Sequence, residues 1–171
     1  MSENTPTPSS ARPPKQSRTG LKSTGTRKAA SKSNRSRARE FALQALYQWQ
    51  IGGGPMRRII EQFNEEQDMA IVDGGYFVDL LNGVETHLEA LDAALAPCLD
   101  RRLDEVDVIE RATLRLAAFE LLHRLDIPYR VVINEAVELA KDFGAEGGHS
   151  YVNGVLDRLA RNTRSAEVRS H

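Results

Sequence analysis

Basic and aromatic side chains share one ridge of the first predicted helix. Arg35, Arg39, Leu43 and Tyr47 fall at intervals of four residues, and Arg37 extends the basic end. Guanidinium groups neutralise phosphates, and a tyrosine ring stacks on an unpaired base for about 1 to 3 kcal/mol. Cations are mildly unfavourable at a helix N-terminus, so their clustering there favours an external partner. The ridge predicts contact with single-stranded RNA; the alternative is that Tyr47 packs on a neighbouring helix and the arginines only solubilise this end.

Acidic side chains crowd the start of a later predicted helix. They are Asp100, Asp104, Glu105, Asp107 and Glu110. Negative charge at a helix N-terminus is favourable on its own, which accounts for part of this clustering. The same charges could also dock a basic protein and steer its association.

The net charge of −1 conceals a split between the two parts of the chain. Residues 1–35 hold eight bases and one acid, whereas the other 136 residues hold 15 bases and 23 acids. Residues 1–34 also carry four prolines, no aromatic residue and few apolar side chains, which predicts a disordered basic arm. Three interpretations stay open for the arm: an inert extension, an electrostatic arm for nucleic acid, or an organelle transit peptide.

Few residue patterns suit an enzyme. Cys98 is the single cysteine, which excludes an intramolecular disulfide framework and fits a reducing compartment. The four histidines have no metal-ligand spacing, and the glycines at 52–54 are followed by no P-loop lysine. No apolar run is long enough to span a membrane. We therefore expect a non-enzymatic cytoplasmic protein with no catalytic residues, metal or cofactor.

Apolar residues recur at helical spacing along the rest of the chain, and no segment alternates with period two. This predicts an all-α bundle of six helices, or seven if the long third stripe breaks. We expect a helical domain over 35–162 and a C-terminal tail over 163–171. The stripes run over residues 38–49, 56–63, 77–95, 108–122, 133–140 and 152–159.

Local details are also predicted for the fourth and fifth helices. Asp107 should pair with Arg111, and Glu120 with Arg124, because each acid precedes its base by four residues. The fourth stripe is apolar around most of its circumference, which indicates a central helix. Gly144 should close the fifth helix as a left-handed cap.

Four segments together resemble the NusB family of transcription antitermination factors, over nearly all of residues 35–161. They read SRAREFALQALYQWQ from Ser36, VIERATLRLAAFELLHR from Val108, IPYRVVINEAVELAKDFG from Ile127 and HSYVNGVLDRLAR from His149. The resemblance implies two packed three-helix bundles. It also implies pairing with NusE, a basic small-subunit ribosomal protein, and binding of boxA RNA in nascent transcripts. The function implied is support of processive ribosomal RNA synthesis within the transcription elongation complex.

The resemblance also assigns roles to residues of this chain. It implies RNA contact by the arginines of the first helix and by the loop over 147–151, and partner contact by acids at and just before the start of the fourth stripe, with Tyr47 nearby. The combined prediction for RNA is Arg35, Arg37, Arg39, Tyr47, His149 and Tyr151, and that for the partner is Asp104 and Glu110.

Two features depart from the family. Gly148 and Ser150 stand where relatives often carry polar and basic residues, which weakens the implied RNA role of this loop. The arm is longer than the family usually has, although the likeness to bacterial members disfavours a transit peptide. A helical protein-interaction module without direct RNA contact is the alternative function, and whether the free protein forms a homodimer is left open.

Overall fold

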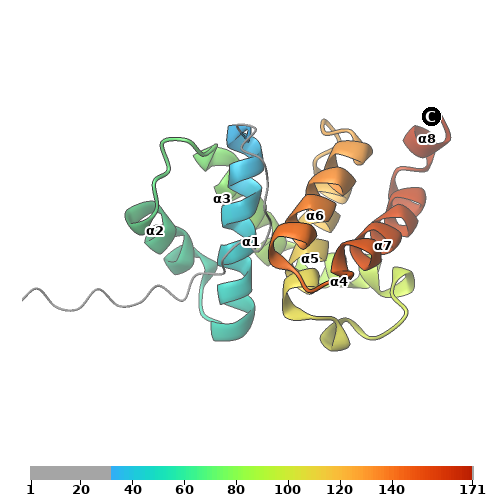
Figure 1. The fold of residues 1–171 in the computed structure, drawn as a ribbon, viewed down its shortest axis with the longest axis horizontal. Helices are drawn as coiled ribbons and strands as arrows, with labels where there is room; N and C mark the ends of the chain where they lie inside the picture. The colour runs from blue at the N-terminus through green and yellow to red at the C-terminus, as the bar shows by residue number, and fades with distance from the viewer. Residues whose placement is uncertain (1–31, 171) are drawn as a thin grey trace, which may run out of the picture.

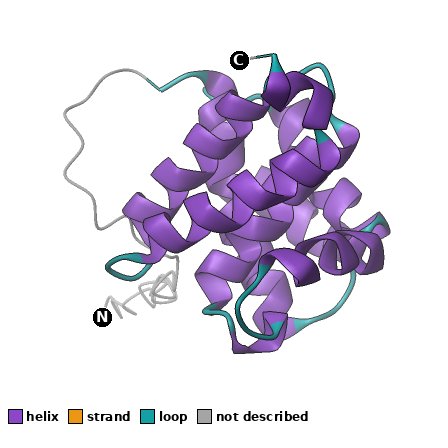
Figure 2. Cartoon of the chain, turned by 90° about the vertical axis from the view of Figure 1, so that its right-hand side faces the viewer, coloured by secondary structure: helices purple, strands orange, loops and turns teal. Residues whose placement is uncertain are grey.

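The computed structural model describes residues 32–170, in which helices are joined by short loops and no strand occurs (Figures 1 and 2). The prediction of an all-α fold is confirmed. The α-helices are α1 (Asn34–Gly52), α2 (Met56–Glu66), α3 (Gly74–Thr86), α4 (Leu88–Leu95), α5 (Val108–His123), α6 (Tyr129–Phe143), α7 (Gly148–Thr163) and α8 (Ser165–Arg169), and the 3-10 turns are η1 (Ala96–Cys98) and η2 (Leu103–Glu105). The predicted arm lies outside the described residues except for its last three.

Two groups of three helices form the core. In the first group α1, α2 and α3 contact one another, and in the second α5, α6 and α7 do so (Figure 1). Helix α5 also packs on α1, α3 and α4, so its apolar residues are buried on several sides. This confirms two packed bundles with a central helix. No helix in the described range is long and apolar enough to cross a membrane.

Side chains of three residues start the helices that position the candidate site. Ser33 accepts a hydrogen bond from the Ser36 amide at the start of α1, and Asp73 accepts one from the Tyr76 amide at the start of α3, both at 3.0 Å. Asp107 does the same for α5. Such caps satisfy amides that have no partner within the first turn.

The long third stripe breaks at His87, whose φ of −105° and ψ of 15° end α3 and precede α4. The seven-helix alternative is therefore correct, with α8 as an addition. The left-handed cap predicted at Gly144 is wrong, because this residue has a φ of −86° and leaves α6 in an extended conformation. The turn is made at Gly147, with a φ of 79°, directly before α7.

Candidate nucleic-acid interface

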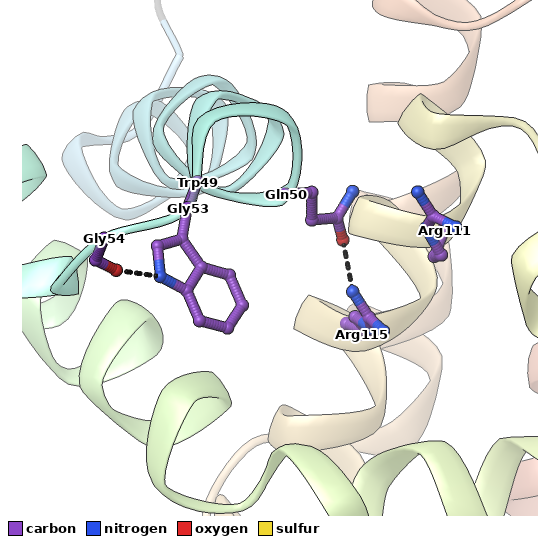
Figure 3. A pocket seen from close by; sticks show the side chains of 6 residues that line it. All are labelled: Trp49, Gln50, Gly53, Gly54, Arg111 and Arg115. Atoms are coloured by element: carbon purple, nitrogen blue, oxygen red, sulfur yellow. Dashed lines mark hydrogen bonds between the residues drawn. The ribbon is translucent and has the colours of Figure 1, made fainter.

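The C-terminal end of α1 borders a cavity of about 380 Å³ that opens beside α5 (Figure 3). Its lining consists of Trp49, Gln50, Gly53, Gly54, Arg111 and Arg115. The Trp49 indole donates to the Gly54 carbonyl at 2.9 Å, and the Arg115 guanidinium donates to the Gln50 amide oxygen at 2.9 Å. Asp92 binds Arg115 through two further hydrogen bonds of 2.9 Å. Arg115 is thus held by its own neighbours and joins α1, α4 and α5.

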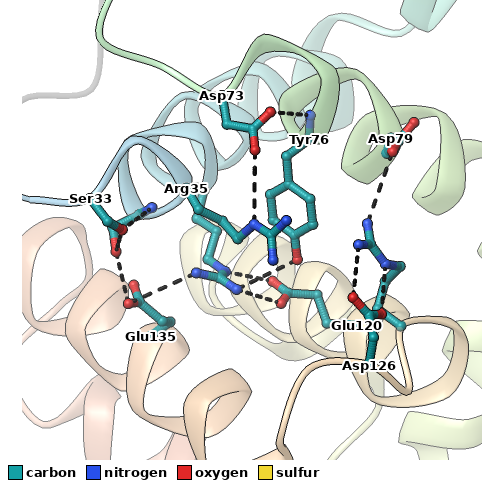
Figure 4. Close-up of polar contacts among 11 residues, drawn as sticks. Ser33, Arg35, Asp73, Tyr76, Asp79, Glu120, Asp126 and Glu135 are labelled. Atoms are coloured by element: carbon teal, nitrogen blue, oxygen red, sulfur yellow. Dashed lines mark hydrogen bonds and ion pairs between the residues drawn. The ribbon is translucent and has the colours of Figure 1, made fainter.

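The N-terminal end of α1 presents Arg35 at the surface. Its side chain is 44% exposed and its Nε lies 3.9 Å from Asp73 Oδ2, while its guanidinium lies 4.5 Å from the centre of the Tyr76 ring (Figure 4). Arg37, two residues later, is half-buried. Both cations belong to the start of the helix, as predicted.

Arg39 does not lie on this surface, which corrects the predicted ridge. The residue is 4% exposed, and its Nε and Nη2 each donate to the Glu120 carboxylate at 2.9 Å. Burial acts to lower the pKa of Arg39, but hydrogen bonds and charge from Glu120 raise it above its ordinary value. Leu43 is fully buried as well, because the face of α1 that meets α5 extends beyond the apolar stripe. Arg39 therefore holds α1 on α5 and offers no direct contact to RNA.

Three guanidinium groups surround the ring of Tyr76 (Figure 4). Those of Arg39 and Arg124 lie 5.3 and 5.0 Å from its centre, in addition to that of Arg35. The predicted Glu120–Arg124 pair is wrong: Arg124 binds Asp126 at 3.1 Å, because Glu120 is taken by Arg39. Burial, and then Glu120, raise the pKa of Tyr76, so the phenol stays neutral at physiological pH.

The chain before α1 reaches the end of α6. Lys32 forms ion pairs with Glu40 and with Asp142, the latter at 3.4 Å. Asp142 is in the last turn of α6, directly before the α6–α7 loop over 144–147 that leads to His149. The Ser36 hydroxyl also donates to Glu135 of α6 at 2.8 Å. The basic start of α1 and the predicted RNA loop, more than 100 residues apart in sequence, thus lie on neighbouring elements.

The aromatic residues predicted to contact RNA are partly covered. Tyr47 is half-buried on α1. The guanidinium of Arg101 lies over the Tyr151 ring, 4.6 Å from its centre, and burial raises the pKa of the Tyr151 phenol. His149 is half-buried one residue inside α7. Of these residues, Tyr151 needs Arg101 to move before its ring face can meet a base.

The predicted acidic face contains Asp104 but not Glu110. The Asp104 side chain is 67% exposed and lies 3.2 Å from the Arg102 guanidinium. Glu110 is only 3% exposed, and its Oε1 accepts a hydrogen bond from the Ala145 amide at 3.3 Å. Asp107 caps α5 and forms no ion pair with Arg111, whose charge only helps to lower the pKa of Asp107. The prediction that Glu110 contacts the partner directly is therefore corrected, because the Glu110 side chain points from α5 into the protein.

Residues 36–161 match the model of the NusB family. A transcription antitermination protein NusB of Xanthomonas oryzae is 60% identical over 133 residues, which cover 78% of this chain and 85% of the relative. A relative of the same name from Xylella fastidiosa is 58% identical over 134 residues, covering 78% and 85%. This chain belongs to the NusB family.

Solved NusB structures share the fold. NusB of T. maritima superposes with a TM-score of 0.70 at 29% identity, covering 82% of this chain and 99% of that one. A complex of the antitermination factors NusB and NusE with double-stranded RNA gives a TM-score of 0.64 at 26% identity, covering 75% and 97%. The NusB fold thus accounts for the described helices, while the arm precedes the matched residues.

Several residues that organise the NusB fold here were not identified from the sequence. Arg115, Tyr76 and Arg164 lie inside or beside apolar stripes and fix the surfaces around the candidate site. One sequence signal could have identified such residues, namely a polar residue within a helix that is apolar on most sides. Such a helix is buried, so its polar side chains must find hydrogen-bond partners inside the protein. The partners come from distant segments, so the sequence does not name them.

Proposed function

We propose that this chain is a transcription antitermination factor that binds boxA-type RNA together with the ribosomal protein NusE, in the cytoplasm and as part of the elongation complex. The family supports this function, since relatives at about 60% identity carry that name. The observation that supports the RNA site is the Lys32–Asp142 contact, which joins the chain directly before α1 to the last turn of α6, next to the α6–α7 loop. The arm, the start of α1 and the start of α7 can then act on one strand.

The proposed RNA surface consists of Arg35 and Arg37, with Lys32 before them in the chain and His149 at the start of α7. Tyr47 and Tyr151 are proposed to stack on unpaired bases at its margins. Arg39 is omitted from direct contact because Glu120 holds it inside. The surface arginines supply phosphate contacts, which depend on charge more than on rigid geometry.

Neutralising Arg35 and Arg37 together should weaken RNA binding. Two lost phosphate contacts should reduce the slope of log affinity against log salt by about 1.4, since each contact contributes about 0.7 for a single strand. The measurement is a titration of boxA-type RNA with the purified heterodimer at several salt concentrations. Arg57→Ala with Arg58→Ala is the matched control, because both residues are exposed on α2. An unchanged affinity and slope in the first double variant would show that this end of α1 does not meet RNA.

NusE is proposed to dock against the acidic face at η2, with Asp104 and Glu105 as its charges. Both carboxylates lie 3.2 Å from Arg102, at the protein surface. Exposed charges at the edge of an interface act mainly on the association rate. The charges of the body, net negative beyond residue 35, suit a basic partner.

Asp104→Lys should therefore slow association with NusE several-fold at low salt and less at high salt, with little effect on dissociation. Stopped-flow or surface-plasmon measurements of the two rates test this. Glu61→Lys, an equal charge change at an exposed site on α2, serves as control. Equal rates for the two variants would contradict the proposed face.

A protein-interaction module without RNA contact is the second candidate. It is favoured by the contacts of Arg35, whose guanidinium already meets Asp73 and Tyr76 within the chain. The RNA titration above separates the two functions, because only an RNA-binding chain responds to loss of both arginines. Sedimentation of the free protein tests the separate proposal of a homodimer.

A further inference from the structure

The carboxyl group of Glu110 is buried where α5 meets the α6–α7 loop, and one of its oxygens has no hydrogen-bond partner among the described residues. Oε1 accepts a hydrogen bond from the Ala145 amide at 3.3 Å, whereas Oε2 is the oxygen left unmatched within residues 32–170. Leaving a buried acceptor unmatched costs about 1 to 3 kcal/mol. Protonation would lower this cost, because a protonated carboxyl group can donate a hydrogen bond to a neighbouring acceptor.

The loop is shaped around this side chain. A Cβ added at Gly148 would lie 2.0 Å from Glu110 Oε1, and one added at Gly144 would lie 3.0 Å from the same atom. Gly147 makes the left-handed turn between them. Glycine at 144 and 148 thus leaves the space that the carboxyl group fills, and the backbone of the loop rests directly on it.

Asp107 is the charged group that acts most on Glu110. Burial first, and then hydrogen bonding with Asp107, raise the pKa of Glu110 to about 7. Hydrogen bonding with Glu110 is in turn the largest cause that lowers the pKa of Asp107, and Arg111 adds to it. A proton on the Glu110 carboxyl group supplies the hydrogen bond to Asp107 that two ionised carboxylates cannot form. The elements packed above contribute the Ala145 amide and two glycines, with Glu146 and His149 as the neighbouring titratable residues.

We propose that Glu110 is a positioning residue that holds the α6–α7 loop, and with it His149 and Tyr151 at the start of α7, in place while it carries its proton. When Glu110 ionises, its buried carboxylate stands beside the exposed, ionised carboxylate of Asp107. Its charge is relieved by admitting water, which requires the loop to lift. An effect of loop opening on RNA binding rests on the proposed function, whereas the role of Glu110 in holding the loop does not.

The sign of the pH dependence follows from the raised pKa. In the open loop Glu110 titrates near its ordinary value of 4.5, and in the closed loop near 7. Closure is thus fully favoured below pH 4.5 and weakens as pH rises to about 7, above which it stays constant. Between pH 6 and pH 8 the population of the open loop should rise about tenfold.

The test is amide hydrogen exchange of Ala145 and Gly148 in the full chain, measured by NMR at pH 6 and pH 8 and corrected for the intrinsic rates. The wild-type protein should lose about tenfold in protection at pH 8. Glu110→Gln should show equal protection at both values, because the neutral amide still accepts from Ala145 and donates to Asp107. Glu146→Gln, which removes an exposed acid of the same loop, should respond like wild type. Constant protection in wild type, or a persistent response in Glu110→Gln, overturns the proposal.

Binding of boxA-type RNA by the heterodimer, measured on the same variants, separates this inference from the proposed function. An RNA affinity that depends on pH in wild type but not in Glu110→Gln supports both the role of Glu110 in the loop and its effect on RNA binding. A loop that responds while RNA affinity is equal at both pH values overturns the link to RNA. Absence of RNA binding at either pH overturns the proposed function and leaves the exchange result to decide the role of Glu110.

Discussion

Glu120→Ala should destabilise the fold by about 3 to 5 kcal/mol, because it leaves the Arg39 guanidinium charged and unpaired inside the protein. Glu120 and Arg39 are 2% and 4% exposed, and two hydrogen bonds of 2.9 Å join them. Among residues 32–170, Arg39 meets no other buried carboxylate as closely, since Glu135 lies 3.9 Å away and is partly exposed. Urea unfolding, followed by circular dichroism, measures the loss.

The double variant Arg39→Met with Glu120→Leu is the informative companion. Replacing both members of a buried ion pair by apolar residues of similar volume is often neutral, so most of the lost stability should return. The double variant should also bind RNA as wild type does, because Arg39 lies beneath the surface. A single variant that loses less than about 1 kcal/mol would contradict the buried pair. A double variant that folds but binds RNA weakly would restore Arg39 as a contact.

The helices were predictable because burial imposes a period on the apolar residues. The apolar spacing predicted the first helix and the central position of α5, whereas it left open whether the third stripe breaks, as it does at His87. Periodicity identifies the face that is buried but not its width. Arg39 and Leu43 lie at the edge of the face of α1, and Arg39 is buried because Glu120 approaches from another helix.

Contacts between distant segments also explain why the burial of Glu110 was not predicted. Its position at the start of α5 suggested a favourable surface charge, since acids suit this end of a helix. The α6–α7 loop covers it instead, and the conformation of that loop depends on glycines 34 to 38 residues away in sequence. Charge patterns thus showed where charged residues cluster along the helices, but contacts between distant segments decide which of these charges reach solvent.

Arg164→Ala should reduce the free energy of unfolding about as much as Glu120→Ala does. Arg164 follows α7 in the segment expected to be a tail, yet it is 6% exposed and its guanidinium donates to backbone carbonyls around the end of α5. The acceptors are Glu120, Leu121, Arg124 and Ile127, at 2.8 to 3.2 Å. Carbonyls at a helix C-terminus have no partner within the helix, and a cation there also meets the favourable end of its dipole.

Removing this guanidinium leaves several buried carbonyls unmatched, at about 1 kcal/mol or more each, so we expect a loss of about 3 to 5 kcal/mol in urea unfolding. Arg164→Lys should recover only part, because one ammonium cannot reproduce a planar fork of donors. Arg161→Ala, at an exposed site one turn earlier in α7, is the control and should change stability by less than about 0.5 kcal/mol. If Arg164→Ala unfolds at the same urea concentration as Arg161→Ala, the final residues act only as a tail. The expected difference instead makes the end of the chain part of what holds α5 against α7.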